Sequence, residues 1–211
     1  MAYGSSSSNN ESHRISSRRA HFLFLCLVSA YFFSFFFRIS ASVVLPQQAS
    51  TLGMSAALTG FISSLYYYAY SVMQSVSGAL HDRFGPLRVV AAGMLVAAAG
   101  TLLLVLRSSE WTLGAWRLFT GLGLAPMFGG ALVYQAGAFS PEKYVFYSSI
   151  TISVGAFGAV ASVAPLGLAL DSFGLPATFA GLAALSIFMS ILLWKERTFD
   201  PVVRRAPSAG Q

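Results

Sequence analysis

The chain has 211 residues, of which 55% are hydrophobic and only 9% are charged, compared with about 25% charged residues in an ordinary soluble domain. So few charges cannot cover a water-facing surface, which excludes a soluble globular domain. The formal net charge of +6 does not indicate nucleic-acid binding, because most lysines and arginines lie between long apolar runs. That distribution is typical of a membrane protein, and no nucleic-acid partner is expected.

The chain begins with a polar segment. Residues 1–19 are rich in serine and asparagine and include three arginines, which predicts a disordered basic cytoplasmic tail. The apolar run that follows, 20–45, is longer than the core of a signal peptide, which has about 7–15 residues. We interpret it as a retained membrane helix, with a cleaved signal as the alternative. Its cysteine, Cys26, has no partner for a disulfide within the chain and is interpreted as a packing residue.

Six stretches are long enough to cross the hydrocarbon core of a bilayer, which takes about 20 apolar residues. They span residues 20–45, 56–80, 87–106, 112–138, 145–170 and 177–194. The links between them are short, so successive helices are predicted to be antiparallel neighbours. The runs also lack the period-two alternation of a membrane β-barrel. We therefore predict an all-α, polytopic bundle of six transmembrane helices over residues 20–195, followed by a cytoplasmic polar tail at 196–211.

The positive residues predict the orientation of this bundle. If the amino terminus is cytoplasmic, ten of the 13 lysines and arginines lie on the inner side and only Arg107 lies in an outer loop. This bias predicts that both termini are cytoplasmic. The remaining two, Arg38 and Arg117, fall within spans. The cell (inner) membrane is the expected location, with an organelle membrane as the alternative.

Two segments of the chain repeat each other. In segment 78–85, at the end of the second span, Gly, Asp, Phe and Gly match the same residue types in segment 167–174, each 89 residues later. An offset of three helices reverses the orientation of a segment in the membrane. The match therefore indicates an inverted repeat of three helices plus three, a pattern found in secondary transporters.

The strongest local motif lies in the turn between the second and third spans. It has the pattern G-x-L-x-D-R-x-G-x-x-R and consists of Gly78, Leu80, Asp82, Arg83, Gly85 and Arg88. Gly78 is expected to let a neighbouring helix approach closely. Asp82 is expected to cap a helix end or lie against a positive helix terminus, and Gly85 to permit the tight turn. Arg83 and Arg88 are expected to keep the turn on the cytoplasmic side.

This motif resembles the signature loop of the major facilitator superfamily, whose residues help to lock the outward-facing state. Arg117 and Gly121, in the pattern R-x-x-x-G-x-G of the fourth span, resemble the family's fourth-helix motif, whose arginine is linked to proton handling in some members. Packing of the first, fourth and fifth helices is the alternative role for Arg117. The resemblance covers residues 20–195 and implies the amino-terminal half of a twelve-helix fold. The closest likeness is to bacterial organic-anion and organophosphate carriers.

Two polar stripes are the candidate substrate-binding surface. Polar side chains recur at helical steps of three or four residues in the first span, namely Tyr31, Ser34, Arg38 and Ser42. A comparable stripe in the second span includes Tyr67, Tyr70 and Gln74. Such stripes are costly in lipid, so we expect them to line a shared aqueous cavity. Arg38 would supply a permanent positive charge suited to a carboxylate or phosphate.

Both stripes have an alternative interpretation. Arg38 lies past the middle of a long helix, so its side chain could instead snorkel to the outer interface. The tyrosines could form an interfacial aromatic belt, for which Tyr66 and Tyr68 are better suited than Tyr67 and Tyr70.

The remaining titratable residues argue against an enzyme. No aspartate or glutamate falls within a span, and His13, His21 and His81 are placed at or beyond the cytoplasmic face. Neither an intramembrane serine hydrolase nor a metal hydrolase can therefore be assembled. No cofactor or metal site is expected. We predict a secondary active transporter, a symporter or antiporter, that moves a small anionic solute by alternating access. It is expected to act with a second six-helix half or a second copy of itself. The alternative is a half-transporter or fragment that moves nothing and acts as a regulatory partner.

Overall fold

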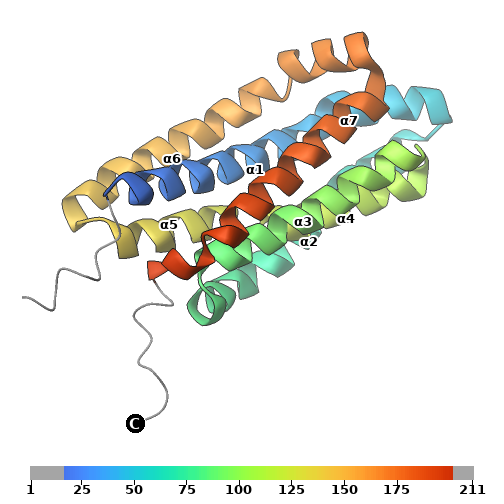
Figure 1. The fold of residues 1–211 in the computed structure, drawn as a ribbon. Helices are drawn as coiled ribbons and strands as arrows, with labels where there is room; N and C mark the ends of the chain where they lie inside the picture. The colour runs from blue at the N-terminus through green and yellow to red at the C-terminus, as the bar shows by residue number, and fades with distance from the viewer. Residues whose placement is uncertain (1–16, 202–211) are drawn as a thin grey trace, which may run out of the picture.

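The computed structural model describes residues 17–201, and this part of the chain is helical with no strand (Figure 1). Most of the predicted amino-terminal tail (1–16) and the segment 202–211 lie outside the described residues. The helices are α1 (Ser17–Leu52), α2 (Ala56–Phe84), α3 (Pro86–Leu106), α4 (Glu110–Leu124), α5 (Met127–Ala138), α6 (Pro141–Ala161) and α7 (Ala164–Lys195), followed by the 3-10 turn η1 (Arg197–Phe199).

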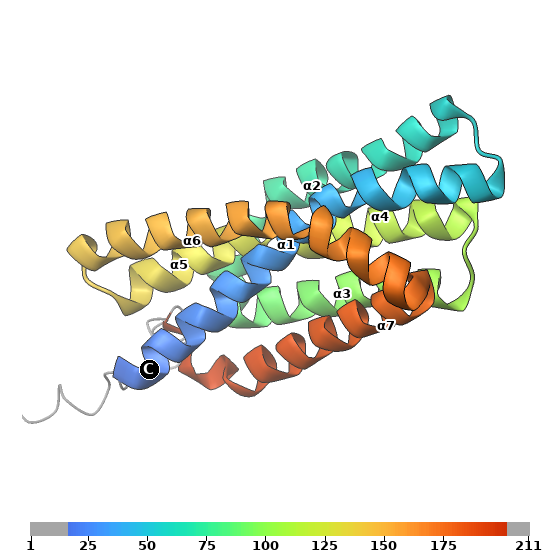
Figure 2. The same ribbon diagram turned by 90° about the horizontal axis from the view of Figure 1, so that it is seen from above.

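These helices form six passes along the bundle. A short break at residues 125–126 divides the fourth pass into α4 and α5. The fifth pass consists of α6 and the first part of α7. At Gly174 the backbone leaves the helical conformation, and the second part of α7 runs back as the sixth pass (Figures 1 and 2). The predicted all-α bundle of six antiparallel helices is therefore confirmed.

The helix ends differ from the predicted ones. The first helix was predicted to stop before Pro46, but α1 runs through this proline to Leu52. Proline removes one backbone hydrogen bond, a loss that membrane helices often tolerate. The side chain of Ser55 then caps α2 by accepting a hydrogen bond from the backbone amide of Leu58. Only Gly85 separates α2 from α3, so the links are even shorter than expected.

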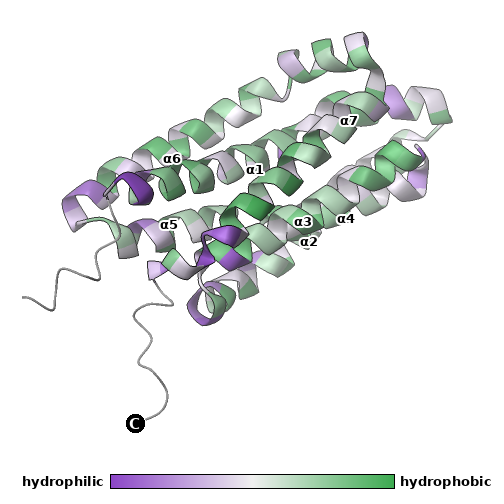
Figure 3. Cartoon of the chain, in the orientation of Figure 1, coloured by the Kyte–Doolittle hydropathy of each residue, from purple (hydrophilic) through white to green (hydrophobic). Residues whose placement is uncertain are grey.

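Five helical segments are long and apolar enough to cross a membrane: Ser17–Leu52, Pro86–Leu106, Glu110–Ala138, Pro141–Ala161 and Ala164–Lys195. Helix α2 is the exception within the described range. It carries the predicted polar stripe, and hydrophilic residues lie at its carboxyl end (Figure 3). Its polar composition therefore distinguishes α2 from the apolar passes and makes it a candidate wall of an aqueous pathway.

The two repeated segments adopt the same backbone conformation. Gly85 has φ 84° and ψ 149°, and Gly174 has φ 74° and ψ 168°. Both values of φ are positive, a region that glycine enters at little cost, and a proline follows each glycine within two residues. These equivalent turns lie at opposite ends of the bundle (Figures 1 and 2), as the predicted inverted repeat requires.

Glycines bring several helix backbones into close contact, as in other membrane bundles. A Cβ atom at Gly121 of α4 would lie only 2.5 Å from the carbonyl oxygen of Tyr66 in α2. A Cβ at Gly158 of α6 would lie 2.4 Å from the carbonyl oxygen of Phe32 in α1. These positions require glycine and fix the distances of α4 from α2 and of α6 from α1.

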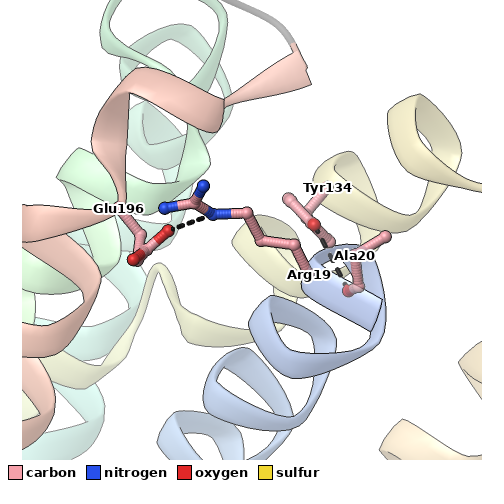
Figure 4. Close-up of polar contacts among 4 residues, drawn as sticks. All are labelled: Arg19, Ala20, Tyr134 and Glu196. Atoms are coloured by element: carbon pink, nitrogen blue, oxygen red, sulfur yellow. Dashed lines mark hydrogen bonds and ion pairs between the residues drawn. The ribbon is translucent and has the colours of Figure 1, made fainter. Parts of the chain in front are cut away.

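Polar contacts join the elements at the end of the bundle where both described termini lie, called the terminal end below. Arg19 at the start of α1 forms an ion pair with Glu196, at 2.8 Å, and the hydroxyl of Tyr134 donates a hydrogen bond to the carbonyl of Ala20 (Figure 4). Asp200 is buried and accepts a hydrogen bond from the backbone amide of Leu87 in the first turn of α3. The first residues of the segment predicted as a polar tail are thus packed against the bundle.

Candidate functional site

The predicted binding residue Arg38 lies in an aromatic environment. Its guanidinium carbon is 4.8 Å from the ring centre of Phe35 and 4.7 Å from that of Tyr70 in α2. Its Nε atom is buried and has no hydrogen-bond partner among the described residues. Aromatic faces attract a cation, but they do not replace the hydrogen-bond acceptors that a buried guanidinium donor needs. Arg38 thus presents a positive charge and an unused donor that suit an anionic ligand.

Arg117 in α4 occupies a different position. It is fully buried, and its two terminal nitrogens donate hydrogen bonds to the carbonyls of Phe37 in α1, at 3.1 Å, and Ser63 in α2, at 3.2 Å. The guanidinium therefore connects three helices through backbone carbonyls. This geometry supports the packing role that the sequence left open for Arg117, although it assigns α1 and α2 as the partners of α4.

Tyr66 lies between the two arginines. Its ring centre is 5.9 Å from the guanidinium carbon of Arg38 and 4.5 Å from that of Arg117. The side chain is fully buried, and its hydroxyl contacts the carbonyl of Ser34 at 3.4 Å. Sequence reasoning considered Tyr66 for an interfacial belt and so missed it. The four-residue step from Tyr66 to Tyr70, whose rings stack with centroids 5.7 Å apart, was the available signal.

Two other candidates on α1 are buried and have different contacts. Tyr31 is buried, with its ring stacked on Phe128 and edge-on to Phe35, the ring that Arg38 also contacts. Ser34 is buried and donates its hydroxyl to the carbonyl of Leu124 in α4. Tyr31 is thus connected to Arg38 through one aromatic ring, whereas the hydroxyl of Ser34 is engaged in helix packing.

Three further candidates face outward from the chain. Ser42 is exposed and donates its hydroxyl to the carbonyl of Ile39 in its own helix. Tyr67 is 49% exposed, and Gln74 is also exposed, on α2. The described chain therefore brings Arg38 together with Tyr70 and Tyr66, while Tyr67 and Gln74 extend the same polar surface along an open face of α2.

The signature-loop residues surround the turn between α2 and α3. Gly85 forms the turn with positive φ, while Asp82 and Arg83 are exposed, with Arg83 over the ring of Phe84. Arg88 is partly buried in the first turn of α3. A Cβ atom at Gly78 would meet nothing within 4 Å among the described residues. The helix expected to approach Gly78 is thus not one of the described helices of this chain.

His81, inside the same motif, was placed at the cytoplasmic face by its sequence position. The structure shows it buried, with its Nε2 atom 3.0 Å from the carbonyl oxygen of Pro126. This carbonyl belongs to the break between α4 and α5. The imidazole therefore connects the signature loop to the interruption of the fourth pass.

The fold and motifs are those of one half of a membrane transporter, and comparison with known proteins identifies the family. Residues 27–210 match the Major Facilitator Superfamily, and the chain belongs to it. The chain is 26% identical to Uncharacterized transporter YybO of Bacillus subtilis (strain 168) over 77% of its own length and 37% of that protein. It is therefore an integral membrane protein of a transporter family.

Two further relatives have names that refer to anions. The chain is 27% identical to Probable sulfoacetate transporter SauU of Cupriavidus necator, over 85% of this chain and 41% of that protein. It is also 27% identical to Probable anion transporter 2, chloroplastic, of Oryza sativa subsp. japonica, over 82% of this chain and 33% of that protein. The chain thus spans well under half of the length of these relatives.

Proposed function

We propose that this chain forms the amino-terminal half of a secondary active transporter that moves a small organic or inorganic anion by alternating access. The observation that carries the proposal is Arg38, a guanidinium on α1 with a buried Nε that lacks a hydrogen-bond partner among the described residues. A cation within a membrane span is costly, and it usually marks a substrate pathway or a partner.

The guanidinium of Arg38 favours an anion over a cation as the solute. Tyr70 and Tyr66 supply aromatic faces, and Tyr67 and Gln74 add hydrogen-bonding groups on the exposed surface of α2. A planar guanidinium can bind two oxygens of a carboxylate, sulfonate or phosphate at once. The names of the relatives refer to sulfoacetate and to anions, which supports the same class of solute.

The open face of α2 also supports a role for a second half. Gly78, Tyr67 and Gln74 are exposed in this chain, and transporters of this kind bind their substrate where two helix repeats meet near the bilayer midplane. The second half would be a further six-helix segment or a second copy of this chain. In this arrangement the terminal end lies on the cytoplasmic side of the inner membrane, because the basic residues gather at that end.

The test is uptake of radiolabelled anions into proteoliposomes that contain the chain alone or together with a candidate second half. Sulfoacetate, a sugar phosphate and inorganic phosphate serve as solutes, and a neutral sugar serves as the control. We expect saturable uptake of at least one anion and none of the neutral sugar. Arg38→Ala should abolish this uptake, and Arg38→Lys should retain part of it because lysine lacks the planar fork. Unchanged uptake by Arg38→Ala protein would refute the site.

A further inference from the structure

A groove runs along the outside of the bundle toward the terminal end. It has a volume of about 470 Å³ and lies between α2 and α3, where α4 contributes Leu122 and Gly123 and the break after α4 contributes Pro126. Apart from one arginine, its lining is formed by apolar side chains and glycine. This volume falls within the range of about 300–1,000 Å³ that is typical of ligand pockets. The groove is therefore large enough to hold a ligand, and its apolar lining suits an apolar ligand.

Arg88 is the charged residue of this groove. It lies in the first turn of α3 and is partly buried, and its buried Nε atom has no hydrogen-bond partner among the described residues. Arg88 also forms no ion pair with any residue between 17 and 201. A positive charge at a helix amino terminus is unfavourable on its own. An anionic group at the mouth of the groove would compensate the positive charge of Arg88 and would supply a hydrogen-bond acceptor for its Nε.

Trp194 places the mouth of the groove at the membrane–water interface. It lines the groove from the end of α7 and is 47% exposed. The guanidinium carbon of Arg197 lies 4.8 Å from the centre of its ring. Tryptophan is enriched at the headgroup level of a bilayer. The apolar part of the groove therefore extends from the headgroup level toward the hydrocarbon core.

We propose that this groove binds an anionic phospholipid, with an acyl chain along the apolar lining and the phosphate on Arg88. The combination of an apolar groove with an unpaired arginine at the interface favours a lipid over a soluble anion. Basic pockets between membrane helices are known to bind the headgroups of anionic lipids. The site is separate from Arg38, and the inference does not rest on the proposed transport of an anion.

The test uses native mass spectrometry of the full chain in detergent, titrated with palmitoyl-oleoyl phosphatidylglycerol or with phosphatidylcholine of the same acyl chains. We expect about fivefold tighter binding of phosphatidylglycerol, because its headgroup has a net negative charge near one arginine, whereas the choline of phosphatidylcholine offsets the charge of its phosphate. Arg88→Gln should make the two lipids bind equally. Arg18→Gln, which removes an exposed arginine from the same end of the bundle, is the matched control and should retain the preference.

A second pair of variants tests the groove itself. Ala92 is an exposed residue that lines the groove, so Ala92→Phe should fill it and weaken the binding of both lipids. Leu95→Phe adds bulk at an exposed residue of α3 that does not line the groove, and it should bind lipid as the unmodified chain does. Equal binding of both lipids by the unmodified chain would overturn the proposal, as would a preference that survives Arg88→Gln. A dimer that excludes lipid, and that Ala92→Phe dissociates, would overturn it by assigning the groove to a second copy.

Discussion

The guanidinium of Arg117 lies against the face of Tyr66, with 4.5 Å between the guanidinium carbon and the ring centre. Both side chains are fully buried, and they belong to α4 and α2, the two helices that Gly121 allows to pack closely. Arg38 approaches the same ring from α1, at 5.9 Å. One tyrosine thus connects a structural arginine to the candidate binding arginine, which gives substitutions at these positions different expected effects.

Arg117→Ala is expected to destabilise the bundle. It removes the hydrogen bonds to the carbonyls of Phe37 and Ser63 and leaves a cavity among three helices. We expect a loss of about 3 kcal/mol or more, as for other buried residues whose removal leaves polar groups unpaired. Arg38→Ala should change stability less, because the side chain of Arg38 is only partly buried, although each arginine has a buried Nε without a partner among the described residues. Thermal unfolding in detergent measures both, and equal losses would contradict the separation of roles.

Tyr66 can be tested with a pair of substitutions. Tyr66→Ala removes the ring between Arg38 and Arg117 and should cost about 3–5 kcal/mol, as for other large aromatic residues in a core. Tyr66→Phe keeps the ring and loses only a long hydroxyl contact with the Ser34 carbonyl, at 3.4 Å, so it should cost about 1 kcal/mol or less. Denaturant unfolding of the purified protein provides the comparison. If Tyr66→Phe were as damaging as Tyr66→Ala, the hydroxyl rather than the ring would be the essential group.

Two glycines of the family motifs should respond in opposite ways to alanine. Gly121→Ala places a Cβ 2.5 Å from the carbonyl oxygen of Tyr66, so α4 must move away from α2 and the melting temperature should fall by several degrees. Gly78→Ala meets nothing within 4 Å among the described residues and should leave the melting temperature of this chain unchanged or slightly raised, since alanine favours the helix.

The same Gly78→Ala variant also tests the role of a second half. If a second half packs on α2 at this position, the variant should reduce co-purification with that half while the isolated chain stays stable. A chain destabilised by Gly78→Ala would mean that the residue is needed within this bundle. Normal co-purification would mean that the second half does not approach α2 there.

Much of this architecture could be predicted because lipid imposes simple rules on a sequence. Apolar length predicted the passes, and the repeat at 78–85 and 167–174 predicted equivalent turns, which Gly85 and Gly174 form with nearly the same backbone angles. Two exact boundaries could not be predicted. Pro46 lies inside α1, because a proline need not end a membrane helix. Residues 125–126 interrupt the fourth pass, although hydropathy there is continuous.

The candidate site was less predictable, because periodicity identifies a polar face but not the neighbour it meets. Tyr70 and Arg38 were predicted to line the same cavity, and in the structure the guanidinium carbon of Arg38 lies 4.7 Å from the centre of the Tyr70 ring. Tyr66 was missed because tyrosines at adjacent positions look alike in sequence, yet only Tyr66 among them is fully buried. His81 was missed because its contact with the Pro126 carbonyl depends on the break in the fourth pass.

Asp82 is expected to act in the conformational cycle rather than in solute binding. It is exposed next to the turn at Gly85, at the carboxyl end of α2, whereas Tyr66 lies nearer the middle of that helix. Asp82→Asn should slow uptake severalfold and change the half-saturating solute concentration little. Initial rates of anion uptake over a range of concentrations separate the two parameters. A raised half-saturating concentration with an unchanged maximal rate would contradict this role.

The contacts at the terminal end should differ in strength according to their burial. The side chains of the ion pair are partly exposed, 41% for Arg19 and 19% for Glu196. Glu196→Gln should therefore lower the free energy of unfolding by about 1 kcal/mol or less. Asp200 is fully buried and accepts a hydrogen bond at the amino terminus of α3, a favourable position for a carboxylate. Asp200→Ala should therefore cost about 1–3 kcal/mol, because it leaves the Leu87 amide without its partner. Thermal unfolding of both variants in the same detergent measures the difference, and a larger loss for Glu196→Gln would show that the exposed ion pair, rather than Asp200, holds the end of α7 to the bundle.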